Sequence, residues 1–180
     1  MRATIMSADA LPLLMHRFGF LVERFGFVVS RTRAVPAGAW YASAAGTVAV
    51  SFDYLRDAAV DVTLREADRG ESYLLSELVA ARRSSPGRRT GIRAPAAFAA
   101  ELDAVAELLV AECDDFLRGD PAAFRVRHRE AMLVARCRRL ALGELRRHAP
   151  ERAAALLGAM RGYWTAADRD AYERCVTSQA

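Results

Sequence analysis

Lysine and asparagine are absent from this chain of 180 residues, and all 26 of its basic side chains are therefore arginine. Together with abundant alanine, this bias is typical of a GC-rich genome, so the isoelectric point near 9.3 is poor evidence for nucleic-acid binding. No stretch approaches the roughly 20 apolar residues that a membrane span needs. The first apolar run is interrupted by Pro12, His16 and Arg17, unlike a secretory signal. We expect a protein without membrane association.

Cysteine is scarce and widely spaced, at Cys113, Cys137 and Cys175. An odd number of distant cysteines without a CxxC pair is typical of reduced thiols rather than of a disulfide framework or a zinc site. The sequence therefore predicts a cytoplasmic protein.

The residue types that carry catalysis are dispersed along the chain. The three histidines show no metal-ligand spacing, and neighbouring helical acids such as Asp114 and Asp115 diverge by about 100° instead of converging on one ion. Phosphate-binding glycine loops and nucleophile elbows are missing. We expect no catalytic residue, no metal and no cofactor, and an enzyme of unrecognised type ranks third among the functions considered.

The first half of the chain combines a helical pattern with strand patterns. Apolar residues recur every three or four positions from Leu11 to Phe25, which predicts one amphipathic helix ended by Gly26. Weak alternation predicts strands at 28–35 and 40–44 around a turn at 36–38, and Ser72 is expected to cap a short helix. Two further strands alternate clearly and form a hairpin. Their inward residues are expected to be Val48, Val50, Phe52, Tyr54, Val60, Val62 and Leu64.

Only helical patterns remain from Pro95 onward. An apolar stripe runs from Phe98 to Phe116, and Asp120-Pro121 predicts the start of a helix that reaches about His148. Further helices are expected after Pro150 and around residues 168–175. The inward residues of the 121–148 helix are expected to be Leu133, Cys137, Leu140, Ala141 and Leu145.

These patterns predict an α+β fold with an N-terminal helix packed on a four-stranded antiparallel meander, followed by a C-terminal helical region. Residues 1–83 would form the helix–meander–helix unit, and residues 84–94 an Arg/Ser/Pro/Gly linker or loop. Residues 95–180 would form the helical region, either separate or packed on the first unit as one domain.

Positive charge is concentrated in two segments. Residues 117–148 carry nine arginines against three acids, and residues 82–93 carry five arginines and no acid. These arginines either pair with acids of the same chain or bind an acidic partner, and Arg136, Arg138 and Arg139 are the candidates for partner contact. Residues 125–147 contain no interleaved aromatic residue for base stacking, which weakens the nucleic-acid interpretation.

Two pairs of neighbouring aromatic residues are the other candidates for partner binding. Trp40-Tyr41 lies on an expected strand, so one of its side chains should face away from the core, and Tyr163-Trp164 follows Gly162 at a helix break. Trp, Tyr and Arg are the residues that most often dominate protein interfaces.

Four segments between residues 11 and 124 together carry a resemblance. They are a helix closing on Phe25-Gly26-Phe27, the hairpin VAVSFDYLRDAAVDVTL, a YLLSELV helix, and a long helix ending LRGDPAAF. In this order they resemble small uncharacterised bacterial α+β proteins of the kind proposed as immunity proteins of polymorphic toxin systems. The resemblance implies a protein partner such as a toxin. It carries no functional residue across and does not extend to the helices after Arg125.

The sequence therefore favours a non-enzymatic protein-binding module, immunity-like, that acts by occluding a protein partner. The alternative is a nucleic-acid-associated protein that binds through the Arg-rich helix 125–147. Association into a homo-oligomer is left open by the sequence.

Overall fold

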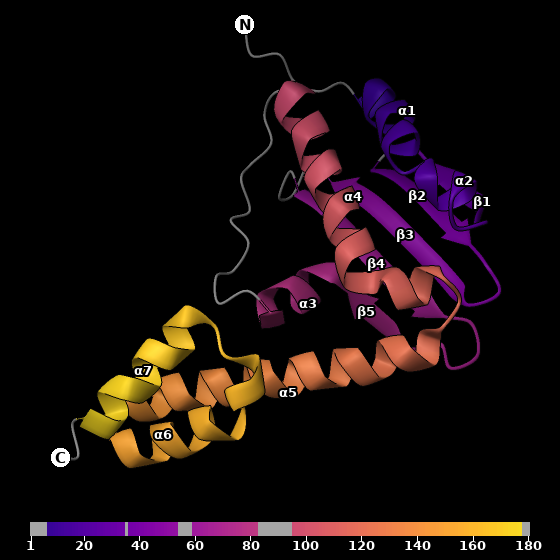
Figure 1. Cartoon of the computed structure of the whole chain (residues 1–180). Helices are drawn as coiled ribbons and strands as arrows, with labels where there is room; N and C mark the ends of the chain where they lie inside the picture. The colour runs from indigo at the N-terminus through magenta and orange to yellow at the C-terminus, as the bar shows by residue number, and fades with distance from the viewer. Residues whose placement is uncertain (1–6, 35, 54–58, 83–94, 178–180) are drawn as a thin grey trace, which may run out of the picture. The chain divides into compact units, whose positions relative to one another are not determined.

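The computed structural model describes residues 7–34, 36–53, 59–82 and 95–177 (Figure 1). The chain divides into two compact units, one formed by Met1–Glu77 with Gly87–Arg125 and the other by Leu78–Pro86 with Val126–Ala180. The predicted domain ranges 1–83 and 95–180 stay a prediction, and the predicted linker at 84–94 lies outside the described residues.

The described part of the chain begins with two short helices and continues with five strands and further helices. The first unit contains α1 (Ser7–Arg17), α2 (Phe20–Glu23), β1 (Val28–Arg33), β2 (Ala37–Ala42), β3 (Gly46–Asp53), β4 (Ala59–Glu66), β5 (Ser72–Leu74) and α4 (Pro95–Leu117). Two helices have residues in both units, α3 (Leu75–Arg82) and α5 (Pro121–Arg146). The second unit also contains α6 (Pro150–Ala159), a 3₁₀ turn η1 (Arg161–Tyr163) and α7 (Ala166–Thr177).

The sheet is antiparallel, with the strands in chain order from β1 to β5. Cross-strand pairs align Ala39 with Val50 and Val50 with Val62, so these residues share one face. That face is buried, as the alternation of the sequence predicted for β3 and β4. It packs against α1 and α4, which lie side by side over it (Figure 1), and the rings of Phe52 and Phe98 are 4.3 Å apart.

Several expected boundaries were wrong. The sheet has five strands instead of four, because Ser72 belongs to β5 and does not cap a helix. The first helical pattern is interrupted between α1 and α2, where the Gly19 amide bonds to the His16 carbonyl in a tighter turn. β2 begins at Ala37 and ends at Ala42, so residues 36–38 are not wholly a turn. Predicted core residue Tyr54 lies outside the described part of the chain.

A polar cluster lies at one end of the sheet, within the first unit. The buried Tyr73 hydroxyl is 2.7 Å from a carboxylate oxygen of Glu66 and 2.7 Å from one of Glu71. Arg125 pairs with the other oxygen of Glu66, and the Phe124 ring stands edge-on to Tyr73. Glu66 is only 2% exposed, so its charge depends on these two partners.

The start of α5 follows the sequence prediction. The Asp120 carboxylate accepts a hydrogen bond from the Ala123 amide at 2.9 Å, and Pro121 is the first helical residue. This Asp-Pro pair therefore caps the helix as expected.

The core of the second unit confirms the prediction for Ala141 and Cys137 but not for Leu133 and Leu140. Small residues of α5, Val134 and Ala141, pack with residues of α6 and α7 and with Met160 between them. Leu133 and Leu140, which were expected to face inward, are instead 62% and 49% exposed. The helical period offers two apolar stripes on α5, and packing against α6 and α7 buries the one with the smaller side chains.

Candidate functional site

The candidate site is the outer face of the sheet, opposite the face that packs on α1 and α4. Cross-strand pairing places Arg31, Trp40 and Ala49 in one row across it, because Arg31 pairs with Trp40 and Trp40 with Ala49. Many residues of this face are small or hydroxyl-bearing and remain partly or fully exposed, namely Ala42, Thr47, Ala49, Ser51, Thr63 and Ser72. The exposed apolar residues Val28 and Leu74 lie on the same face nearer its edges.

The ring of Trp40 lies next to Gly38 on this face. A Cβ atom built on Gly38 would be 3.1 Å from the Trp40 ring and 3.4 Å from the Val50 carbonyl oxygen, so a larger residue would require the ring to shift by a few tenths of an ångström. On a strand, residues two positions apart share a face, which is why the glycine and the indole meet. Gly38 thus leaves space for the Trp40 ring on the outer face, where Trp40 is partly exposed.

Arg31, on the neighbouring strand β1, contacts the Trp40 ring. The Arg31 guanidinium carbon is 5.1 Å from the centre of the Trp40 ring, a cation–π contact. Next to it, a bulge in β1 at Ser30 directs the serine hydroxyl to the Trp40 carbonyl oxygen, to which it donates at 3.1 Å. Together these contacts orient Trp40 before any partner arrives.

Charge on the outer face is mainly positive near β1. Arg31 and Arg33 lie on exposed β1, and Arg65 lies on β4, while Asp61 is the acid whose side chain is exposed on β4. A surface with an aromatic centre and arginines near its border matches the composition of protein interfaces.

Tyr41 faces the opposite way. It is 1% exposed and belongs to the core, as the alternation along β2 requires once Trp40 faces outward. Burial raises the pKa of its phenol to about 12, and the hydroxyl has no hydrogen-bond partner among the described residues. The Tyr41 side chain therefore offers no surface to a partner in this conformation.

Of the second aromatic pair, Trp164 packs in a core and Tyr163 is exposed. The Trp164 indole N–H donates to the Leu157 carbonyl at 2.7 Å, and its ring lies 4.8 Å from Tyr172, so Trp164 closes the core of the second unit. Tyr163 is 53% exposed. Only Tyr163 of this pair presents most of its ring to solvent.

The three arginines predicted to contact a partner have different surroundings. Arg138 is nearly buried and pairs with Asp168, with Nε at 2.8 Å from Oδ2, and it also donates to the Tyr163 carbonyl. Arg136 and Arg139 are exposed on α5. Ion pairs within the chain thus account for Arg138, for Arg118 with Asp114 and for Arg125 with Glu66. Arg136 and Arg139 are the two predicted contact arginines that lie on the surface.

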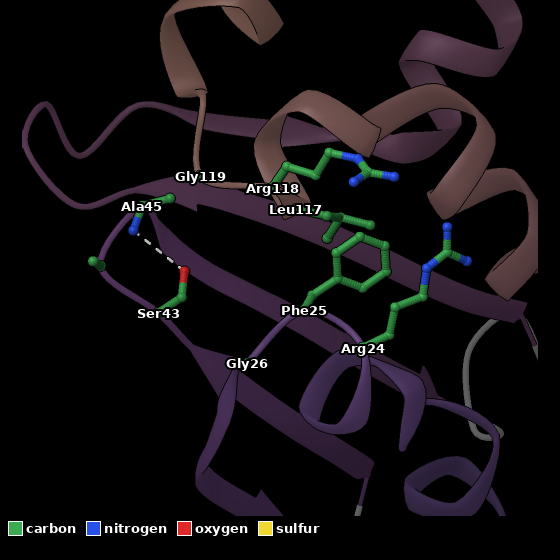
Figure 2. Close-up of a pocket in the computed structure, with 9 residues that line it drawn as sticks. Arg24, Phe25, Gly26, Ser43, Ala45, Leu117, Arg118 and Gly119 are labelled. Atoms are coloured by element: carbon green, nitrogen blue, oxygen red, sulfur yellow. Dashed lines mark hydrogen bonds between the residues drawn. The ribbon is translucent and has the colours of Figure 1, made fainter.

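A hollow of about 500 Å³ also occurs in the first unit. Figure 2 shows its lining, with the turn at Ser43–Ala45 on one side and Phe25 and Leu117, from the ends of α2 and α4, on the other. Its lining residues include Arg24 and Arg118 but no histidine, cysteine or acid, and Arg118 is already paired with Asp114 at 2.6 Å. The hollow therefore contains no set of residues for acid–base or nucleophilic chemistry.

Within the described residues, no group of three or more His, Cys, Asp or Glu side chains is arranged to hold a metal ion. No described helix is long and apolar enough to cross a membrane.

Comparison with known proteins gives no relative. No protein-family model matches the chain, and no curated protein and no solved structure is significantly similar to it. The interpretation of the outer face therefore depends on its own geometry.

Sequence reasoning selected Trp40 but missed the residues that position it. Gly38 and Arg31 are the two that matter, and the spacing Gly-x-Trp within a strand pattern was the signal for the first. Arg31 could not be found in the same way, because its contact with Trp40 depends on the bulged register between β1 and β2.

Proposed function

We propose that this protein is a cytoplasmic, non-enzymatic binding module that occludes a protein partner with the outer face of its sheet. The observation that carries the proposal is the Trp40 ring, which lies over Gly38 and under Arg31 on a face where its neighbours on β2 and β3 are small or hydroxyl-bearing. The resemblance of residues 11–124 to candidate immunity proteins agrees with this role, and a toxin is the kind of partner it implies.

Preorganisation is the physical reason for choosing this face. A tryptophan held in one orientation loses little conformational entropy when a partner covers it, so most of its buried area contributes to affinity. The small residues around it let a second surface approach closely and exclude water, as the surroundings of interface hot spots do. Arg31 and Arg33 near the border would steer an acidic partner surface to this site.

The first experiment identifies the partner and tests the face together. The tagged protein is isolated from its own host, the proteins that co-purify with it are identified by mass spectrometry, and affinities are measured with the purified partner. Trp40→Ala should weaken binding by ~2 kcal/mol, about 30-fold. Tyr163→Ala, which removes an aromatic ring that is 53% exposed in the second unit, is the matched control and should leave the affinity within about twofold.

Equal affinities for the wild type and Trp40→Ala, with circular dichroism showing both folded, would contradict the choice of this face. Nucleic-acid binding through residues 125–147 is the competing account. About four phosphate contacts would give a slope near −3.6 of log affinity against log salt. A protein interface centred on Trp40 should show a much shallower slope.

A further inference from the structure

The exposed side of α5 carries a second, separate surface in the second unit. Val126, Leu133 and Leu140 are spaced by seven residues and are 58%, 62% and 49% exposed. A spacing of seven drifts by only about 20° per step around a helix, so the three side chains form one line. We call Val126, Leu133 and Leu140 the α5 stripe.

The α5 stripe is not part of the core. The inward side of α5 is formed by Ala131, Val134 and Ala141, and the last two pack in the cluster that includes Leu157 and Met160. Large aliphatic side chains usually face this core side of an amphipathic helix. Their placement about 100° around the helix from Val134 and Ala141, outside the core, indicates a surface that another element covers.

Charge along the α5 stripe indicates the kind of partner. Arg129 and Arg136 are exposed and follow Val126 and Leu133 by three residues, which places each about one turn further along the same side. Glu130 is the exposed acid near them. With the α5 stripe as position d of a heptad, Arg129 and Arg136 occupy the flanking position g, which pairs with charged residues of an opposing helix.

Two other occupants fit less well. A nucleic acid would use Arg129 and Arg136 but would leave the leucines exposed to water, and aromatic side chains for base stacking are missing from 125–147. A second copy of α5 would place arginines opposite arginines, and like charges in that arrangement repel. An acidic helix satisfies both the leucines and the arginines.

We propose that the α5 stripe is a docking site for an amphipathic helix of a protein partner, with an apolar line flanked by glutamate or aspartate. This surface is distinct from the Trp40 face, and the proposal does not depend on the function proposed for that face. Binding would follow the helix-in-groove or coiled-coil mode, in which apolar residues at heptad spacing supply the affinity and the flanking charges set the choice of partner.

The test uses the full chain and two synthetic peptides of about four heptads, both with leucine at the two core positions. One has glutamate at the flanking positions and the other has lysine. Fluorescence anisotropy should show that the glutamate peptide binds at least about tenfold more tightly than the lysine peptide. Leu133→Gln should weaken this binding about tenfold or more, and Arg129→Glu with Arg136→Glu should reverse the preference between the peptides.

Leu142→Gln is the matched control. Leu142 is 51% exposed, like Leu133, but lies nine residues away, about two and a half turns, and so faces the opposite side of α5. The Leu142→Gln variant should bind the glutamate peptide as tightly as the wild type does. An equal loss in Leu133→Gln and Leu142→Gln, or no binding of either peptide, would overturn the proposal.

Three further measurements separate the other occupants. Leu133→Gln should leave the melting temperature unchanged within about 2 °C, and a clear loss would mean that Leu133 is covered within the chain. Sedimentation that shows a dimer lost in Leu133→Gln would make the occupant a second copy. Tight binding of labelled duplex DNA or single-stranded RNA that requires Arg129 and Arg136 but not Leu133 would make it a nucleic acid. Each of these results would refute the acidic-helix assignment.

Discussion

The neighbouring residues Arg138 and Arg139 provide the sharpest test of which arginines are structural. The side chains of Arg138 and Asp168 are 11% and 9% exposed, and they pair at 2.8 Å. Replacing Arg138 by methionine removes the cation and leaves the Asp168 carboxylate buried. Arg139 is exposed on the next position of the helix, so Arg139→Met removes the same charge without that consequence.

The expected loss of unfolding free energy depends on the hydrogen bonds that Asp168 keeps after Arg138 is replaced. Breaking a buried ion pair by removing one partner costs 3–5 kcal/mol in typical cases. Here the Asp168 carboxylate still accepts hydrogen bonds from the Thr165 amide and hydroxyl, both at 2.8 Å. These remaining bonds favour the lower limit, and we expect Arg138→Met to lower the free energy of unfolding by ~3 kcal/mol. Arg139→Met should change it by less than about 0.5 kcal/mol.

The assay is urea denaturation, with unfolding monitored by tryptophan fluorescence. A Trp40→Phe background leaves Trp164 as the reporter, and Trp164 packs in the core of the unit that contains Arg138. The double variant Arg138→Met/Asp168→Leu should be less destabilised than the sum of its two single changes, because it no longer buries an unpaired charge. Losses that agree within about 0.5 kcal/mol for Arg138→Met and Arg139→Met would refute the structural role of Arg138.

Three further predictions concern the first unit. Tyr41→Phe should raise the free energy of unfolding by ~1 kcal/mol at neutral pH, because it removes a buried hydroxyl without a partner. In the wild type, burial raises the pKa of Tyr41 from 10.0 to about 12, so the phenol is neutral in both the folded and the unfolded state below pH 10, and stability falls between pH 10 and 12 because only the unfolded state ionises there. Denaturation at several pH values should show that Tyr41→Phe lacks this contribution to the fall. Tyr73→Phe should cost ~2 kcal/mol in urea denaturation, because Glu66 loses the hydroxyl that donates to it, and an unchanged midpoint would contradict this. Gly38→Ala should displace the Trp40 ring and shift its fluorescence while the chain stays folded, whereas an unchanged emission spectrum in a Trp164→Phe background would show that the ring does not rest on Gly38.

Local patterns predicted much of the fold and failed where two patterns competed. The alternation of β3 and β4 identified their buried residues because a strand has only two faces and one of them was consistently apolar. β5 was missed because its three residues are too few for alternation, and Ser72 also matches a helix cap. The break at Gly19 was missed because the apolar spacing continues across it.

The candidate site residues were likewise predicted where local sequence sufficed and missed where a distant contact decided their role. Trp40 could be selected from the sequence because Trp40-Tyr41 on one strand must place one ring outward. The role of Arg138 could not be separated from that of Arg136 or Arg139, because its acid, Asp168, lies on another helix.

The sequence by itself determined the α+β class, the inward residues of β3 and β4, the apolar stripe of α4 and the start of α5 at Asp120-Pro121. Each depends on residues that are close in the chain, where periodicity and capping act directly. Only the tertiary structure decided that Trp40 lies over Gly38 beside Arg31, that Arg138 is an internal ion-pair partner, and that Leu133 and Leu140 face solvent. Those outcomes depend on strand register and on which helix packs against α5, and such long-range contacts leave no regular spacing in the sequence.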